Sequence, residues 1–191
     1  MNFLGHLYFS NNDISIMQPN LFGDFVKGKD LSMYPNKIQE GITLHRKIDQ
    51  YVDHHPAVIE LLHELYEPLP KVAGIAVDLF FDHLLAKNWD QFSTIQLDEF
   101  IHQFYNSIDP STEFYTPHFQ LVLSKMQERN WLYHYQYLDG LNKSCLGVSR
   151  RLSFPNKLID GVKVFEQHKT RIEEAFTIYM KDAQLFFSLS R

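Results

Sequence analysis

The sequence predicts an all-α protein, and three observations lead to that prediction. Apolar residues recur at steps of three and four over most of the 191 residues, which is the spacing of one helix face. No stretch alternates apolar and polar residues between hairpin turns. No internal repeat or low-complexity tract interrupts the pattern. We therefore expect one domain over residues 1–191, a bundle of roughly eight helices around a single core.

The N-terminal part contains two short elements. Residues 2–10 favour a short helix that leaves His6 among apolar neighbours, either as a core histidine bonded to a backbone carbonyl or as part of a site. Residues 20–28 (NLFGDFVKG) favour a short helix or turn in which two glycines bracket Asp24. That carboxylate either caps a helix or points into a crowded centre.

A long helix is predicted from residue 36 to residue 55, where His55-Pro56 ends it. His45 and Asp49 lie on its apolar stripe and should face the core, and Asp53 stands one turn further on. The alternative to a functional site is an internal hydrogen-bonded pair of His45 and Asp49, with Asp53 in solvent. The stripe consists of Ile38, Ile42, His45, Asp49 and Val52.

Residues 71–89 predict a helix, and its stretch 72–86 is apolar on every side except for Asp78, Asp82 and His83. Such a helix is normally buried, and a buried carboxylate is costly unless it is paired, protonated or bound to a cation. Asp78 and Asp82 share one helical face, where they repel each other unless a cation or a proton lies between them. No Lys or Arg lies between residues 72 and 86, so the partner comes from elsewhere or is a metal ion.

The other predicted helical segments are expected mainly to pack against the core. A small basic cluster, SRR, lies near the end of one of them at Ser149 to Arg151, and is either a solvated helix end or a contact for phosphate or an acidic partner. The predicted segments are 57–66, 97–108, 117–137, 141–152 and 158–187.

Bulk properties exclude several classes of protein. The net charge is -5 and the pI is about 6.0, with no basic tail, so a role in nucleic-acid binding is not expected. No apolar run approaches the roughly 20 residues of a membrane span, and the N-terminus does not look like a signal peptide. The single cysteine, Cys145, cannot form an internal disulfide, which agrees with a reducing compartment. We expect a cytoplasmic protein with no membrane partner.

The inward polar residues form a candidate metal site. They offer carboxylates and imidazoles but no thiolate, a mixture that suits Mn²⁺, Mg²⁺, Fe²⁺ or Zn²⁺. A metal so placed lowers the pKa of bound water and neutralises charge on a phosphoryl group. The sequence contains no GxSxG, GxxxxGK[ST], GxGxxG or HExxH motif. The inward set is His6, Asp24, His45, Asp49, Asp53, Asp78, Asp82 and His83.

Five blocks, in order along the chain, resemble the acyl-carrier-protein phosphodiesterase family, also called ACP hydrolases. The family is similar to the all-helical HD-domain metal phosphohydrolases, although this sequence has no His-Asp dipeptide and only the reversed Asp82-His83. By position, His55 of DHHP also falls on a matching motif position. The blocks are MNFLGHLYFS at 1–10, GDFVKG at 23–28, GITLHRKIDQYVDHHP at 41–56, AGIAVDLFFDHLLAKNW at 73–89 and GVSRRLSFPN at 147–156.

The resemblance implies hydrolysis of holo-acyl carrier protein to the apo protein and 4′-phosphopantetheine, with a divalent cation, usually Mn²⁺. Placed on this sequence, it leads to a set of predicted roles. The metal ligands are His45, Asp49, Asp78, Asp82 and His83; the catalytic residues are Asp24, Asp53 and Arg46; and the substrate-binding residues are Lys27, Lys47, Arg150 and Arg151, with Lys29 as a further docking candidate.

Two alternatives stay open at this stage. A metal phosphohydrolase of another phosphodiester or nucleotide would share the same polar core. A non-catalytic helical binding protein would use the aromatic helices for a cofactor or partner and would need no metal.

Overall fold

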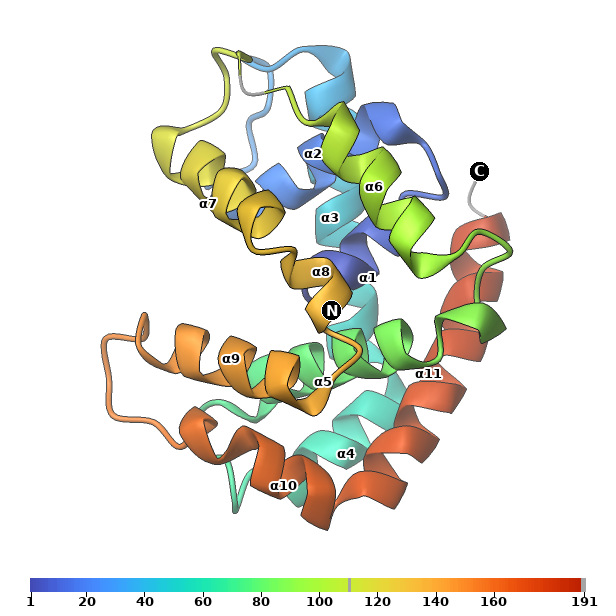
Figure 1. The fold of residues 1–191 in the computed structure, drawn as a ribbon, viewed down its shortest axis with the longest axis vertical. Helices are drawn as coiled ribbons and strands as arrows, with labels where there is room; N and C mark the ends of the chain where they lie inside the picture. Colours follow the sequence, from blue (N-terminus) through green and yellow to red (C-terminus); the bar gives the residue numbers. More distant parts are fainter. Residues whose placement is uncertain (110, 190–191) are drawn as a thin grey trace.

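Helices make up all the regular structure in the computed structural model, which describes residues 1–109 and 111–189 (Figure 1). The all-α prediction is confirmed, with eleven α-helices and three short 3-10 helices in this part of the chain. In order they are α1 (Phe3–Tyr8), α2 (Ile14–Phe22), η1 (Gly23–Phe25), α3 (Asn36–His54), α4 (Pro56–Leu65), α5 (Ala73–Lys87), η2 (Trp89–Gln91), α6 (Leu97–Ser107), α7 (Pro117–Glu128), α8 (Trp131–His134), α9 (Leu138–Ser149), η3 (Leu158–Asp160), α10 (Gly161–Gln167) and α11 (Lys169–Leu189).

The number of helices exceeds the prediction because two predicted helices are broken and one was not predicted. The segment 117–137 divides at Asn130, whose left-handed backbone (φ 47°) ends one helix and starts the next. The segment 158–187 divides at His168 into α10 and α11. Helix α2 precedes the predicted element at 20–28, and its N-terminus is capped by the Asp13 carboxylate, which accepts from the Ser15 N–H at 3.0 Å.

Helix α5 lies at the centre of the fold, as its all-round apolar sequence predicts. Phe80, Phe81, Leu84 and Leu85 are completely buried. The helix contacts α1, α4, α9 and α11, which come from both ends of the chain. Figure 1 shows the N-terminus in the middle of the view, beside α8, so the first residues of the chain lie close to this central helix.

The most extensive helix pair is α2 with α3, and glycine makes their close approach possible. A Cβ atom at Gly41 of α3 would lie 2.6 Å from the carbonyl carbon of Pro19 and 2.7 Å from the backbone nitrogen of Asn20. Backbone atoms at that distance leave no room for a side chain. The pair brings Asn20 and the His45 turn of α3 into the same polar region.

Among the helices that the structure describes, none is both long enough and apolar enough to cross a membrane.

Candidate metal site

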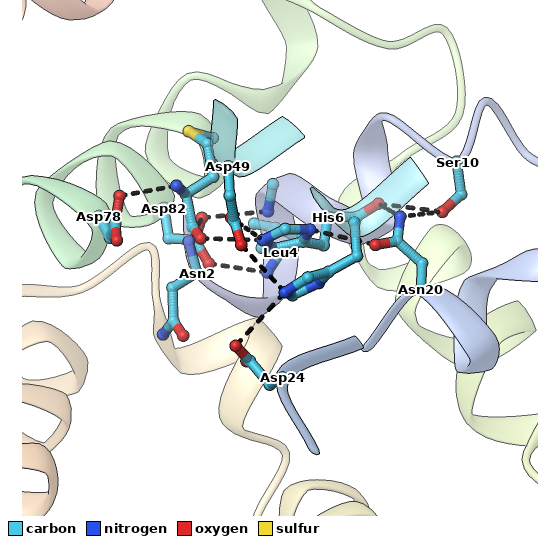
Figure 2. A network of polar contacts seen from close by, with 12 residues as sticks. Asn2, Leu4, His6, Ser10, Asn20, Asp24, Asp49, Asp78 and Asp82 are labelled. Atoms are coloured by element: carbon cyan, nitrogen blue, oxygen red, sulfur yellow. Dashed lines mark hydrogen bonds and ion pairs between the residues drawn. The ribbon is translucent and has the colours of Figure 1, made fainter. Parts of the chain in front are cut away.

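Two histidines and one aspartate converge at the centre of the N-terminal half (Figure 2). His6 comes from α1, and His45 and Asp49 come from successive turns of α3. One ligand atom of each lies within 4.8 Å of the others. His6 Nε2 is 3.2 Å from Asp49 Oδ1, and His45 Nε2 is 3.1 Å from Asp49 Oδ2. The carboxylate therefore offers one oxygen to each imidazole.

Local packing explains why the two rings meet. His45 and Asp49 are four residues apart, so they project from one face of α3, as the sequence predicted. The His6 ring stacks on the His45 ring, with centroids 4.1 Å apart and planes inclined by 16°. Gly23 of η1 also lies against His45, because a Cβ there would come within 2.6 Å of His45 Cδ2. Both rings are buried, whereas the Asp49 side chain is 43% exposed.

The electrostatics of the cluster favour a single positive charge, carried by His45. Burial lowers the pKa of His6, and the neighbouring His45 acts in the same direction. Burial also opposes a charge on His45, but hydrogen bonds to Asp24 and Asp49 outweigh it and raise the pKa of His45 to about 9. Although burial opposes the shift, His45 and His6 hold the pKa of Asp49 far below its usual range. A cation between these groups would be stabilised by the same carboxylates.

Two further carboxylates approach the cluster from the solvent side. Asp24 Oδ1 is 3.4 Å from His45 Nε2, and its side chain is 55% exposed. Asp53 is exposed at the end of the same face of α3 as Asp49. Its pKa is raised by partial burial and by the charges of Asp78 and Asp49. The structure thus places Asp24 beside His45, and Asp53 one turn beyond Asp49 on α3.

Asp78 and Asp82 have other partners in this structure. The Met1 α-ammonium group donates to Asp78 Oδ1 at 2.6 Å. The buried Asp82 carboxylate accepts the backbone N–H groups of Asn2, Leu4 and Gly5 at 3.1, 2.7 and 3.0 Å (Figure 2). Burial raises the pKa of Asp82 to about 7, against the opposing effects of the ammonium group and these N–H groups. The two aspartates hold the N-terminal segment, beside the histidine cluster.

His83 lies apart from the cluster. Its Nδ1–H donates to the backbone oxygen of Tyr135 at 2.7 Å, and its buried Nε2 has no partner among the described residues. The small space beside it is lined by Asn2, Asp82 and Tyr135. His83 points to another face of α5 than Asp82 does, and it contacts Tyr135, at the end of α8, and Phe165 of α10.

The predicted cationic residues lie in three different settings. The Arg46 guanidinium donates to the backbone oxygens of Gly28 (2.7 Å) and Val26 (3.4 Å), so it anchors the segment that follows Asp24. The Lys47 ammonium lies over the Phe186 ring of α11, 4.9 Å from its centroid. The residues on exposed surface are Lys27, Lys29, Arg150 and Arg151.

The donor set fits a divalent cation. Two imidazole nitrogens and a carboxylate are common ligands of catalytic metal sites, which also keep a coordination position open for water or substrate. Asp24, at the exposed side, is placed to complete the set. An all-α fold with this buried histidine–carboxylate cluster open at one side defines a helical protein with a candidate site for a hydrolytic metal ion.

Comparisons with known proteins identify the group to which this helical protein belongs. A family profile described as acyl carrier protein phosphodiesterase matches residues 1–183. Relatives named acyl carrier protein phosphodiesterase include one from Photorhabdus laumondii, 34% identical over 92% of this chain and 89% of its own length. Another, from Klebsiella pneumoniae, is 31% identical over 92% of each chain. One from Salmonella agona is 29% identical over the same shares.

The chain belongs to the acyl carrier protein phosphodiesterase family. This confirms the resemblance inferred from the sequence blocks. No solved structure matches the chain, so the likeness to HD-domain enzymes stays a prediction.

Sequence reasoning found part of this site and missed other parts. It brought together His45, Asp49 and Asp24, which the helical spacing and the glycine bracket indicate. It weighed His6 but left it out of the predicted ligands, since a lone histidine in a short apolar helix carries no spacing signal. It gave no role to Asn20, whose contacts with His6 depend on the packing of α2.

Proposed function

We propose that this protein is a metal-dependent phosphodiesterase that hydrolyses holo-acyl carrier protein, releasing 4′-phosphopantetheine and leaving the apo protein. Family membership supplies the reaction class and the carrier protein as substrate. The observation that carries the proposal is the convergence of His6 Nε2, His45 Nε2 and the Asp49 carboxylate within 4.8 Å. In a member of this family, such a cluster would hold the divalent cation that takes part in phosphodiester hydrolysis.

In this proposal His6, His45 and Asp49 hold the cation, and Mn²⁺ is the proposed metal, with Mg²⁺ or Fe²⁺ as alternatives. The bound cation would lower the pKa of a water molecule and neutralise charge on the phosphodiester. Asp78 and Asp82, which the sequence also favoured as ligands, would support the site from α5, because they fix the segment that carries His6. His83, the third ligand that the sequence favoured on this helix, contacts Tyr135 and Phe165 instead.

Asp24 and Asp53 are the proposed proton carriers. Asp24 is exposed and lies 3.4 Å from His45 Nε2, where it can accept a proton from the attacking water or complete the ligand set. Asp53 has a raised pKa, which suits a group that gives a proton to the departing serine oxygen of the carrier protein. The two carboxylates lie on the solvent side, where a protein substrate approaches.

Exposed cations are the proposed contacts for the carrier protein. Acyl carrier proteins are acidic, while this chain has a net charge of -5, so docking needs local positive charge. Lys27, Lys29, Arg150 and Arg151 are exposed, and Lys47 lies on α3 near the cluster. Arg46 would act by holding the Asp24 segment through Gly28, and its remaining N–H groups are available to phosphoryl oxygens.

The test is a mass-spectrometric assay of holo-acyl carrier protein incubated with the purified protein, first stripped of metal and then supplied with Mn²⁺, Mg²⁺ or Fe²⁺. We expect loss of the prosthetic group only with a divalent metal. His45→Gln and Asp49→Asn should abolish the reaction. The matched controls His102→Gln on α6 and Asp90→Asn in η2 change exposed residues outside the cluster and should leave it intact.

A carrier protein that keeps its prosthetic group with every metal would refute the proposed substrate. Turnover of a small phosphodiester in the same preparation would then identify a metal phosphohydrolase of a different substrate. Absence of both activities together with absence of metal binding would refute the hydrolytic site itself.

A further inference from the structure

We propose that Asn20 is a positioning residue of the metal site, because its amide fixes His6 in the tautomer that leaves the Nε2 lone pair facing Asp49. This inference deepens the proposed function and rests on it for the metal, but the tautomer itself is a property of the metal-free protein.

The Asn20 amide can adopt only one orientation. Asn20 is completely buried on α2, and its Nδ2 group donates to the backbone oxygen of His6 at 2.8 Å and to Ser10 Oγ at 3.0 Å. The Ser10 hydroxyl donates to the same His6 oxygen at 2.9 Å, so its oxygen is left to accept. Turning the amide over would place two carbonyl oxygens 2.8 Å apart with no hydrogen between them. The Oδ1 atom therefore faces His6 Nδ1, at 3.1 Å.

This orientation determines which nitrogen of His6 carries the proton. An amide oxygen only accepts hydrogen bonds, so the His6 Nδ1 atom must donate. In the neutral ring the other nitrogen, Nε2, then has a lone pair and no hydrogen. A hydrogen bond on one ring nitrogen is the usual device that presents the other to a metal.

The surroundings of His6 Nε2 are those of a ligand atom. It faces Asp49 Oδ1 at 3.2 Å and the backbone oxygen of Met1 at 3.1 Å, and both oxygens are acceptors. In the Nδ1–H tautomer a lone pair therefore points at two further lone pairs. That arrangement is unfavourable unless a cation lies between them, so the tautomer set by Asn20 stabilises a bound cation.

The second histidine of the cluster has no such control. His45 Nδ1 is buried and has no hydrogen-bond partner among the described residues. Its Nε2 can donate to Asp24 or Asp49 in the metal-free protein. The two imidazoles thus differ: His6 is preset for metal binding, whereas His45 must change its protonation when the metal binds.

The position of Asn20 depends on the close packing of α2 and α3. Gly41 lies against the Asn20 backbone, so the amide has little freedom to move away from His6. In Figure 2 Asn20 and Ser10 lie on one side of His6, and Asp49 lies on the opposite side, as the proposed role requires.

Nuclear magnetic resonance of the metal-free protein tests the tautomer directly. Long-range ¹H–¹⁵N correlation spectra distinguish a protonated ring nitrogen from one with a lone pair. At a pH where His6 is neutral, we expect a protonated Nδ1 and an unprotonated Nε2. A neutral ring protonated at Nε2 instead of Nδ1 would overturn the proposal without the need for any variant.

Variants separate positioning from simple packing. Asn20→Leu removes the acceptor, so we expect His6 to shift its proton to Nε2, where Asp49 accepts it, and Mn²⁺ affinity to fall roughly 10–100-fold by calorimetry. Asn20→Asp keeps an oxygen facing His6 Nδ1 and should retain the Nδ1–H tautomer, although its second oxygen faces the His6 backbone oxygen in place of Nδ2 and should lower the stability of the protein. Ser10→Ala is the matched control: it cuts the same amide network but spares the contact with His6 Nδ1, so the tautomer and affinity should not change.

The outcomes also separate this inference from the proposed function. Wild-type affinity with an unchanged tautomer in a folded Asn20→Leu would overturn the positioning role. If wild-type protein shows the expected tautomer but binds no Mn²⁺, the metal-dependent function fails while the control of His6 by Asn20 stands.

Discussion

Replacing Gly23 by alanine should damage the metal site by displacing one ligand. A Cβ at this position would lie 2.6 Å from His45 Cδ2 and still closer to His45 Cγ and Cβ, whereas ordinary contacts begin at 3.4 Å, so the His45 side chain must retreat by at least about 0.8 Å. The ring cannot rotate freely, because His6 is stacked on one of its faces with the ring centroids 4.1 Å apart. A misplacement of about 1 Å in a catalytic group can cost on the order of 100-fold in rate. Overpacking should also cost about 1–3 kcal/mol of unfolding free energy.

The assay compares Mn²⁺ affinity, hydrolysis of holo-acyl carrier protein and thermal unfolding for Gly23→Ala and for a control, Gly74→Ala. A Cβ atom at Gly74, in α5, would meet no other atom within 4 Å, so alanine there adds helix propensity without a clash. We expect Gly23→Ala to lose roughly 10–100-fold in activity and in affinity, and Gly74→Ala to lose neither.

A Gly23→Ala protein that folds and keeps wild-type affinity and activity would refute the reasoning. That result would mean either that the ring moves without cost or that His45 does not contribute to the site.

Further predictions concern Asp82, His45 and Arg151. Asp82→Ala leaves three N–H groups at the start of α1 without their acceptor. The unfolding free energy should therefore fall by about 2–5 kcal/mol, and the Leu4 amide hydrogen should exchange faster with solvent. Unchanged stability and unchanged exchange would contradict this role of Asp82. The pKa of His45 is raised from 6.5 to about 9, so its stabilising contribution is complete below pH 6.5 and is lost as pH rises through 9 in the metal-free protein. Over the same range Mn²⁺ should bind about tenfold more tightly per pH unit, because binding releases that proton, and a pH-independent Kd in calorimetry would contradict this. Arg151→Glu should raise KM for holo-acyl carrier protein several-fold and leave kcat unchanged. The control is Lys163→Glu, which changes an exposed residue of α10. Equal KM values for the two variants would count against docking at Arg151.

Helical periodicity predicted most of the fold, because the apolar stripes that it detects are the faces that pack. It failed where the backbone conformation of one residue decides the result. Asn130 adopts a left-handed conformation that a continuous apolar pattern does not reveal. Helix α2 was missed although Asp13 is a good N-cap residue, since Pro19 in its interior argues against a helix.

The candidate site was predictable where its residues share one helix and, for Asp24, where two glycines bracket the residue. His45 and Asp49 follow from their spacing on α3. The need of Asp78 and Asp82 for partners was also inferred correctly, but the partners seen in the structure are groups of the N-terminal segment, 77 to 80 residues away in sequence. No local pattern reports such contacts, which depend on how α1 packs against α5.

The most direct test of the central claim is a crystal structure of the protein with Mn²⁺, with anomalous diffraction recorded at the manganese edge. We predict one anomalous peak within about 2–2.5 Å of His6 Nε2, His45 Nε2 and an Asp49 oxygen. A peak held instead by Asp78 or Asp82, or no peak in a protein that hydrolyses holo-acyl carrier protein, would contradict the assignment of the metal site to the histidine cluster.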